Sequence, residues 1–157
     1  MNIPEKVAEL QALVARARGD HFRLVWLVGG SSPERTALLR AFAETDGAVF
    51  VELGKKLSGS LLVVPIPLRS ASVEECFAVC LAETPEEVTC LDHLEILFEP
   101  TLRINPVSLI KGASRRAVIL AAWPGTSGQG CLLYGLPDHP AHVRIPALDL
   151  ESIIYLL

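Results

Sequence analysis

Residues 23–42 read RLVWLVGGSSPERTALLRAF and combine three patterns that together indicate the fold. The apolar run 24–28 is typical of a strand that is buried on both faces of a parallel sheet. Gly29-Gly30 follows as a turn, and apolar side chains then recur at helical spacing over residues 33–44. A strand that enters a helix through a glycine turn is the arrangement that binds phosphate groups on backbone N–H donors.

The turn departs from the phosphate-loop pattern G-x-x-x-x-G-K-[ST] in two places. Over residues 29–36, Gly29 and Thr36 match, whereas Glu34 stands at the second glycine and Arg35 at the lysine. The planar guanidinium of Arg35 is not a conservative replacement for a lysine that reaches the β- and γ-phosphates. Glu34 places a carboxylate at the helix N-terminus, near the expected position of the phosphates, and would repel an incoming triphosphate.

A structural role also accounts for these residues. Ser31-Ser32-Pro33-Glu34 is a Ser-x-x-Glu capping box, and with Ser32 as the cap, Pro33 takes the favoured first helical position. The carboxylate then supplies the anion that the helix dipole would otherwise take from a ligand, an effect of roughly 0.3–1 kcal/mol. The stretch is therefore either a nucleotide site or a turn that keeps only the shape of one.

Composition limits the classes of protein that the chain can belong to. Its 157 residues suit a single domain, and 50% apolar with 20% charged residues excludes general disorder. The net charge of −4 disfavours direct nucleic-acid binding without excluding it, since Lys111 and Arg115-Arg116 are the densest candidate for a local basic patch. Four cysteines without metal-ligand spacing indicate free thiols in a reducing cytosol. With no signal-peptide pattern and no run of about 20 apolar residues, we expect a soluble, cytoplasmic protein without membrane contact.

Strand and helix patterns alternate along the rest of the chain. We expect a leading amphipathic helix within residues 1–19 and a core over residues 23–145. The further strands are predicted at residues 48–53, 87–91, 117–123, 131–134 and 143–145, with a polar turn at 126–130. The further helices are predicted at residues 55–64, at 73–83 behind a Ser72 cap, and from Pro106 behind an Asn105 cap. This order predicts one domain of three-layer α/β type over residues 1–157, with a mainly parallel sheet like that of P-loop NTPases and no helical lid domain.

Residues 88–95, VTCLDHLE, supply the acidic partner that a phosphate-loop ATPase requires. In such enzymes a carboxylate ends the strand beside the loop strand and holds a magnesium-bound water, while a second acid orients the attacking water. Asp92 ends an apolar run in this manner, and Glu95 lies three residues further along. Many strands end in Asp, so the signal depends on the glycine turn that precedes it.

The order of motifs over about residues 24–145, most densely over residues 91–140, resembles BrxF, the small P-loop protein family of type III bacteriophage-exclusion (BREX) systems. The positions that carry the resemblance are Asp92, Glu95, Leu97-Phe98, Pro106, Ser114-Arg115, Trp123-Pro124-Gly125, Tyr134 and His139-Pro140. The resemblance implies an AAA-like ATPase core that works with other proteins of a phage-defence system. Four departures accompany it: Glu34-Arg35-Thr36 in place of Gly-Lys-Thr, His93 and Arg116 in place of Asn, and Ala141-His142 in place of Glu-Tyr.

Two hypotheses follow for the function. In the first, the chain is a nucleotide-dependent switch or accessory ATPase that uses ATP and Mg²⁺. Its metal ligands would be Asp92 and Thr36, and Glu95 would orient the water. The phosphates would bind Arg35 and the backbone of Gly29, Gly30, Ser31 and Ser32. Arg115 would reach the γ-phosphate of a neighbouring subunit, although a solvated position at a helix C-terminus also explains it.

In the second hypothesis the chain is a catalytically inactive P-loop module that acts in protein interaction or assembly. The incomplete loop favours this interpretation. A mean hydropathy of +0.39 also favours it, because a lone domain of this size rarely exposes large apolar patches. We therefore expect self-association or a protein partner.

Overall fold

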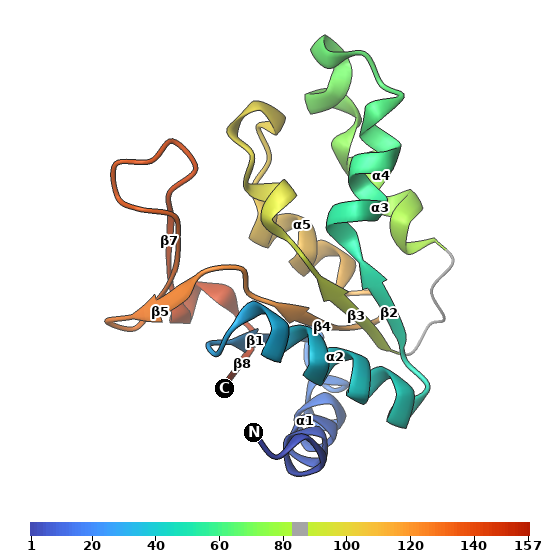
Figure 1. Ribbon diagram of the computed structural model, residues 1–157, viewed down its shortest axis with the longest axis vertical. Helices are drawn as coiled ribbons and strands as arrows, with labels where there is room; N and C mark the ends of the chain where they lie inside the picture. Colours follow the sequence, from blue (N-terminus) through green and yellow to red (C-terminus); the bar gives the residue numbers. More distant parts are fainter. Residues whose placement is uncertain (83–87) are drawn as a thin grey trace.

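The computed structural model describes residues 1–82 and 88–157. A five-stranded sheet forms its centre, in the order β2-β3-β4-β1-β8, and every pairing in it is parallel (Figure 1). The strands are β1 (Leu24–Val28), β2 (Val49–Glu52), β3 (Val88–Asp92), β4 (Val118–Ala122) and β8 (Ile153–Leu156). The predicted α/β class with a mainly parallel sheet is therefore confirmed.

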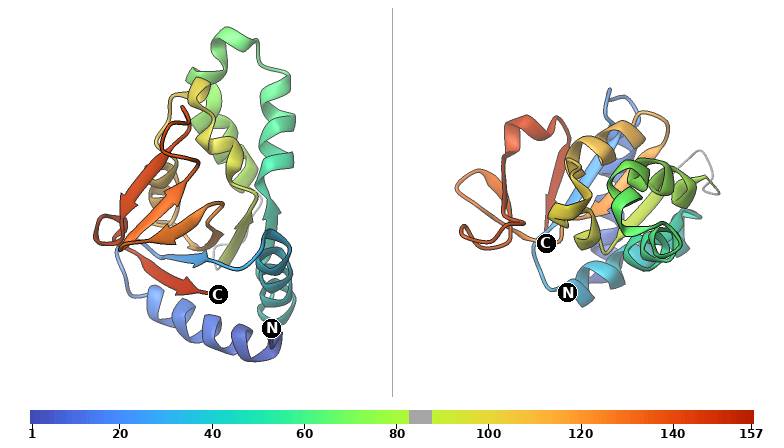
Figure 2. Two further views of the ribbon diagram at one scale, coloured as in Figure 1. Left: turned by 60° about the vertical axis from the view of Figure 1, so that its left-hand side comes forward. Right: turned by 90° about the horizontal axis from the view of Figure 1, so that it is seen from above.

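Helices cover both faces of this sheet (Figure 2). The helices α1 (Ile3–Ala17) and α2 (Ser32–Asp46) pack on one face, where they bury Val25 and Leu27 of β1. The other face carries α3 (Leu53–Leu62), α4 (Arg69–Leu81) and α5 (Pro106–Ala113). Trp26 of β1 belongs to the core on that face. Successive side chains of one strand thus enter opposite cores, which is why residues 24–28 are all apolar.

A second, antiparallel sheet projects from one side of the parallel sheet (Figure 1). It consists of β5 (Thr126–Gly128), β6 (Cys131–Tyr134) and β7 (Val143–Pro146). Aromatic contacts join it to the core: the rings of Tyr134 and Phe98 lie 4.2 Å apart, and Phe98 packs at 5.4 Å against Trp123. Short 3-10 turns complete the chain at η1 (Ile66–Leu68), η2 (Glu95–Phe98), η3 (Pro100–Leu102) and η4 (Ala147–Leu150).

The structure differs from the sequence-based predictions mainly near the C-terminus. The strand at residues 143–145 is not the last, because β8 follows it and pairs with β1. The polar turn at residues 126–130 includes a short strand, β5, because its backbone pairs with β6 despite its polar side chains. Leu150 is fully buried, so the apolar core extends beyond residue 145.

Helix starts were predicted with mixed success. Asn105 caps α5 as expected, since its side chain accepts a hydrogen bond from the Ser108 N–H at 3.1 Å. The predicted Ser72 cap is wrong, because α4 begins at Arg69 directly after η1. The 3-10 turn η1 ends at Leu68 and leads directly into α4, so the helix begins three residues before Ser72. The predicted helix end at residue 83 and strand start at residue 87 lie outside the described residues.

Over residues 1–82 and 88–157, helices long and apolar enough to cross a membrane are absent.

Candidate functional site

Helix α2 begins one residue closer to the glycine turn than a Ser32 cap would place it. Ser31 is the N-cap, as the Ser-x-x-Glu pattern of residues 31–34 predicts: its hydroxyl accepts a hydrogen bond from the Glu34 N–H at 3.2 Å, so the alternative Ser32 cap is wrong. The Arg35 N–H donates to the Ser31 carbonyl at 3.0 Å and closes the first helical turn. Pro33 therefore lies one position later than predicted and contributes no N–H. The helix starts at the fourth position of the phosphate-loop pattern, so few backbone donors remain for a phosphate.

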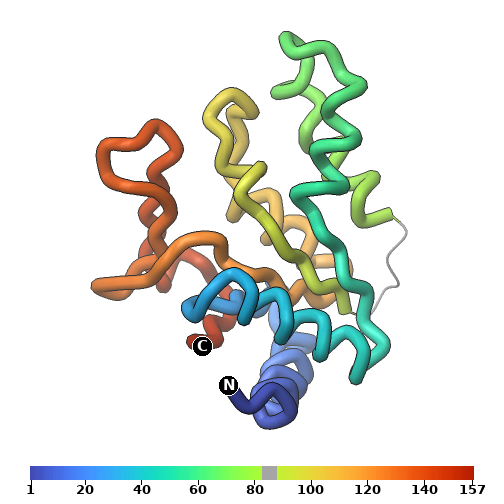
Figure 3. The backbone as a smooth tube through the Cα atoms, in the orientation of Figure 1, coloured from blue at the N-terminus to red at the C-terminus, as the bar shows by residue number. Residues whose placement is uncertain are grey.

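The glycine turn itself is tightly covered. Gly29 and Gly30 have φ values of 92° and 61°, which favour glycine. A Cβ added to Gly30 would lie 2.6 Å from Leu157 Cδ2 and 2.9 Å from Glu34 Oε2. The Leu157 N–H donates to the Val28 carbonyl at 2.8 Å, which holds the C-terminal residue beside the turn (Figure 3). A leucine and an internal carboxylate thus occupy the space next to Gly30.

Arg35 points back into the turn. Its Nη1 donates to the carbonyl oxygens of Gly29 at 2.9 Å and Gly30 at 3.0 Å, and the residue is only 8% exposed. Charge-assisted hydrogen bonds of this kind are stronger than those between neutral groups, and they offset the desolvation of the guanidinium. The side chain at the lysine position of the pattern therefore stabilises the turn and is not free to reach a phosphate.

Thr36 and Asp92 form the second part of the site. The Thr36 hydroxyl donates to Asp92 Oδ2 at 2.5 Å, and Asp92 is 3% exposed at the end of β3. Asp92 Oδ1 accepts a hydrogen bond from the His93 N–H at 2.9 Å. The expectation that the acidic residue ends the strand next to β1 is wrong, because β4 lies between β1 and β3. Thr36, the fifth residue of α2, nevertheless reaches Asp92, because β1 and β3 are parallel and end at the same edge of the sheet.

Glu95 lies farther from this contact, with His93 between the two acids. His93 Nε2 is 3.5 Å from Asp92 Oδ2, and its Nδ1 is 4.0 Å from Glu95 Oε2. The Glu95 side chain is 48% exposed, and His93 adopts a left-handed backbone conformation with φ 57°. Among residues 1–82 and 88–157, groups of three or more His, Cys, Asp or Glu side chains that could hold a metal ion are absent.

Arg115 is not part of this arrangement. It is exposed, follows α5 and precedes β4, so it lies at the edge where the parallel strands begin. Gly29 follows the end of β1, and Asp92 is the last residue of β3, so both lie at the opposite edge. The five residues of β4 separate the two edges by roughly 16 Å. Within one chain Arg115 therefore cannot act on a ligand at the glycine turn.

Two residues of the site were not predicted from the sequence. Leu157 covers Gly30, and the apolar run at residues 153–157 is the signal that could have indicated a strand there. His93 bridges the two acids, but a histidine after a strand carries no specific pattern. The four cysteines are free thiols; Cys90 lies in β3 two residues before Asp92, and burial raises its pKa to about 12, which keeps that thiol protonated and unreactive.

No family model matches the sequence, and comparison with curated proteins finds no significant relative.

Proposed function

We propose that this chain is an assembly subunit with a P-loop NTPase-like fold whose own glycine turn has lost nucleotide binding. The observation that carries the proposal is the pair of hydrogen bonds from Arg35 to the carbonyls of Gly29 and Gly30. A phosphate loop needs N–H groups that face the ligand, and a cation that is free to bind it. Here the cation binds the loop instead.

Two neighbouring groups support the same conclusion. Glu34 places its carboxylate 2.9 Å from the position of a Gly30 Cβ, where it repels an anion. Leu157 fills the space on the same side of the turn with an apolar side chain that cannot donate a hydrogen bond. A triphosphate would have to displace Leu157 and the Arg35 side chain together, and would still face Glu34.

The biological setting that we propose is phage defence of the BREX kind, in complex with other proteins of the system. This part rests on the order of motifs from Asp92 to His139-Pro140. In that setting a subunit without hydrolysis would contribute surfaces for assembly. The surplus of apolar residues, with a mean hydropathy of +0.39, supports such a role.

A second candidate function is the nucleotide-dependent switch, and one observation favours it. Thr36 and Asp92 remain in direct contact, as the two protein groups near a magnesium ion would be. In this alternative, Mg²⁺ bound with ATP would lie beside Thr36 and Asp92, and Glu95 would orient water. Arg35 would first have to leave the two carbonyls.

Thermal unfolding with and without millimolar Mg-ATP tests the proposal. An ATP concentration 100 times the dissociation constant would stabilise the fold by about 2.7 kcal/mol, which raises the Tm of a domain of this size by roughly 5–11 °C. We expect no shift and no phosphate release. A clear rise in Tm, abolished by Thr36→Ala, would support the switch instead. The matched control is Glu34→Gly with Arg35→Lys: if it gains a shift, the assay can detect binding and the two loop residues alone account for its loss.

A further inference from the structure

The tip of the α3–α4 hairpin is exposed and apolar. Residues 61–68 read LLVVPIPL and carry no charge. Four of their side chains are largely exposed: Leu62 (72%), Val63 (85%), Ile66 (76%) and Leu68 (55%). These four residues are called the apolar tip below. Figures 1 and 2 show it at the far end of the hairpin, projecting from the body of the molecule. An exposed cluster of this kind is typical of an interaction site.

The apolar tip is held in one conformation. The Leu68 N–H donates to the Pro65 carbonyl at 2.8 Å, and the Val64 N–H donates to the Leu61 carbonyl at 3.0 Å. The Arg69 guanidinium donates through Nε to the Val64 carbonyl at 2.9 Å. A preformed tip loses little conformational entropy when it binds, so its apolar side chains can contribute to affinity.

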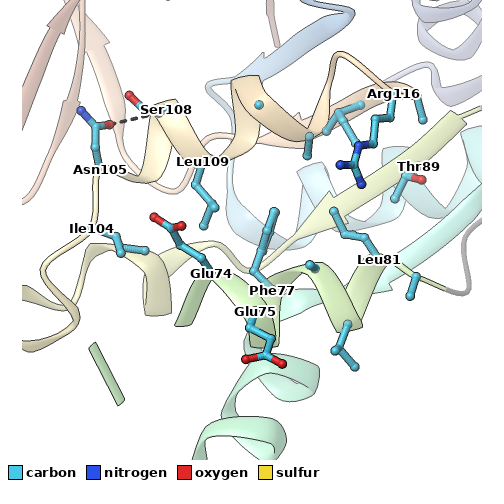
Figure 4. Close-up of a pocket in the computed structure, with 17 residues that line it drawn as sticks. Glu74, Glu75, Phe77, Leu81, Thr89, Ile104, Asn105, Ser108, Leu109 and Arg116 are labelled. Carbon is cyan, nitrogen blue, oxygen red and sulfur yellow. Dashed lines mark hydrogen bonds between the residues drawn. The ribbon is translucent and has the colours of Figure 1, made fainter. Parts of the chain in front are cut away.

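A groove lies between α4 and α5, with a volume of about 820 Å³ (Figure 4). Phe77 and Val79 of α4 line one wall, Leu109 of α5 lines the other, and Ile119 of β4 contributes to the lining. Val79 is 61% exposed. The charged residues of the lining are Glu74, Glu75 and Arg116. This surface is called the α4–α5 groove below.

We propose that the α4–α5 groove binds the apolar tip of a second copy of this chain. The inference deepens the proposed function, on which it rests, by naming the partner of the assembly subunit. Both surfaces are largely apolar, and their net charges are of opposite sign: the two carboxylates of Glu74 and Glu75 outnumber the guanidinium of Arg116 in the groove, and Arg69 is the charged residue next to the uncharged tip. The tip of one chain cannot fill its own groove, because the rigid helix α4 begins at the tip and separates Leu68 from Phe77 of the groove by roughly 13 Å.

The contact is head to tail, because each chain offers its tip to one neighbour and its groove to another. Such heterologous interfaces generate a closed ring or an open filament, whereas a two-fold dimer uses the same patch on both chains. Two variants that each lose one surface should therefore complement one another when they are mixed.

Sedimentation velocity and light scattering of the full chain test this inference. The tip variant is Val63→Glu with Ile66→Glu, and the groove variant is Val79→Glu; all three positions are exposed, so the fold should persist. We expect the wild type to form oligomers whose mass rises with concentration. Each variant alone should associate about tenfold or more weakly, as when charges replace apolar anchors. An equimolar mixture should form a 1:1 heterodimer, because one intact groove meets one intact tip.

Three results would overturn the inference: a monomeric wild type, a mixture that stays monomeric, or a tip variant that dissociates while the groove variant does not. The last result would indicate tip-to-tip contact. Leu148→Glu is the matched control, since Leu148 is 92% exposed and belongs to neither surface. Circular dichroism verifies that each variant is folded, and Ile66→Ser and Val79→Ser replace any variant that is not. A monomeric wild type that also ignores Mg-ATP would refute self-assembly while leaving the loss of nucleotide binding intact.

Discussion

Replacing Arg35 by methionine should destabilise the fold markedly, because the guanidinium stabilises the glycine turn from within. Arg35→Met keeps most of the aliphatic stem and removes the two hydrogen bonds to the carbonyls of Gly29 and Gly30. Hydrogen bonds to charged groups contribute about 1.5–3 kcal/mol each. Both bonds come from one nitrogen and share its desolvation cost, so we expect a loss of about 2–4 kcal/mol in the free energy of unfolding.

Urea unfolding followed by tryptophan fluorescence measures this loss, since Trp26 and Trp123 are both fully buried. Arg35→Lys should lose less, because an ammonium group can still donate to one carbonyl. Arg16→Met is the matched control on the exposed face of α1, where a change within about 0.5 kcal/mol is expected. If Arg35→Met is no more destabilising than Arg16→Met, the guanidinium does not stabilise the turn, and the argument against phosphate binding loses its main support.

Three further changes test other contacts. Thr36→Val should cost about 1–3 kcal/mol, because it removes one hydrogen bond from buried Asp92; in a double-mutant cycle with Asp92→Asn, additive effects would refute a direct contact. Gly30→Ala should lower stability by about 1–3 kcal/mol, since its φ is +61° and the new Cβ would lie 2.6 Å from Leu157; an unchanged Tm would contradict this. Burial raises the pKa of Tyr155 from 10.0 to about 12. The folded state therefore holds this proton more tightly, and the stability it adds is complete below pH 10 and lost as the pH rises towards 12. Tyr155→Phe should flatten this alkaline loss in unfolding experiments, and an identical pH profile would contradict the assignment.

The central strands were predictable because their physical signal is local. Residues buried on both faces must be apolar throughout, and this gives the runs at β1 and β4. The end strand β8 gives a weaker signal, because it pairs with β1 alone and its side chains are mostly half-buried. Its place in the sheet depends on a contact with β1 more than 120 residues earlier in the chain, which local patterns do not report.

The site was predictable in its parts but not in its geometry. The pairing of Thr36 with Asp92 could be expected, because α2 follows the end of β1, Asp92 ends β3, and parallel strands end at the same edge of a sheet. The inward direction of Arg35 does not follow from the sequence, because it depends on whether α2 begins at Ser32 or later. The start of the helix depends on which of two adjacent serines, Ser31 or Ser32, is the N-cap. The cover that Leu157 gives to Gly30 depends on β8 and was missed with it.

Isothermal titration calorimetry of Mg-ATP into the wild-type chain tests the central claim most directly. With Arg35 bound to the turn and Glu34 beside it, we predict no heat beyond dilution at millimolar ATP. The same titration into Glu34→Gly with Arg35→Lys shows whether restoring the pattern restores binding. A saturable heat from the wild-type chain, lost in Thr36→Ala, would contradict the claim and establish the turn as a working nucleotide site.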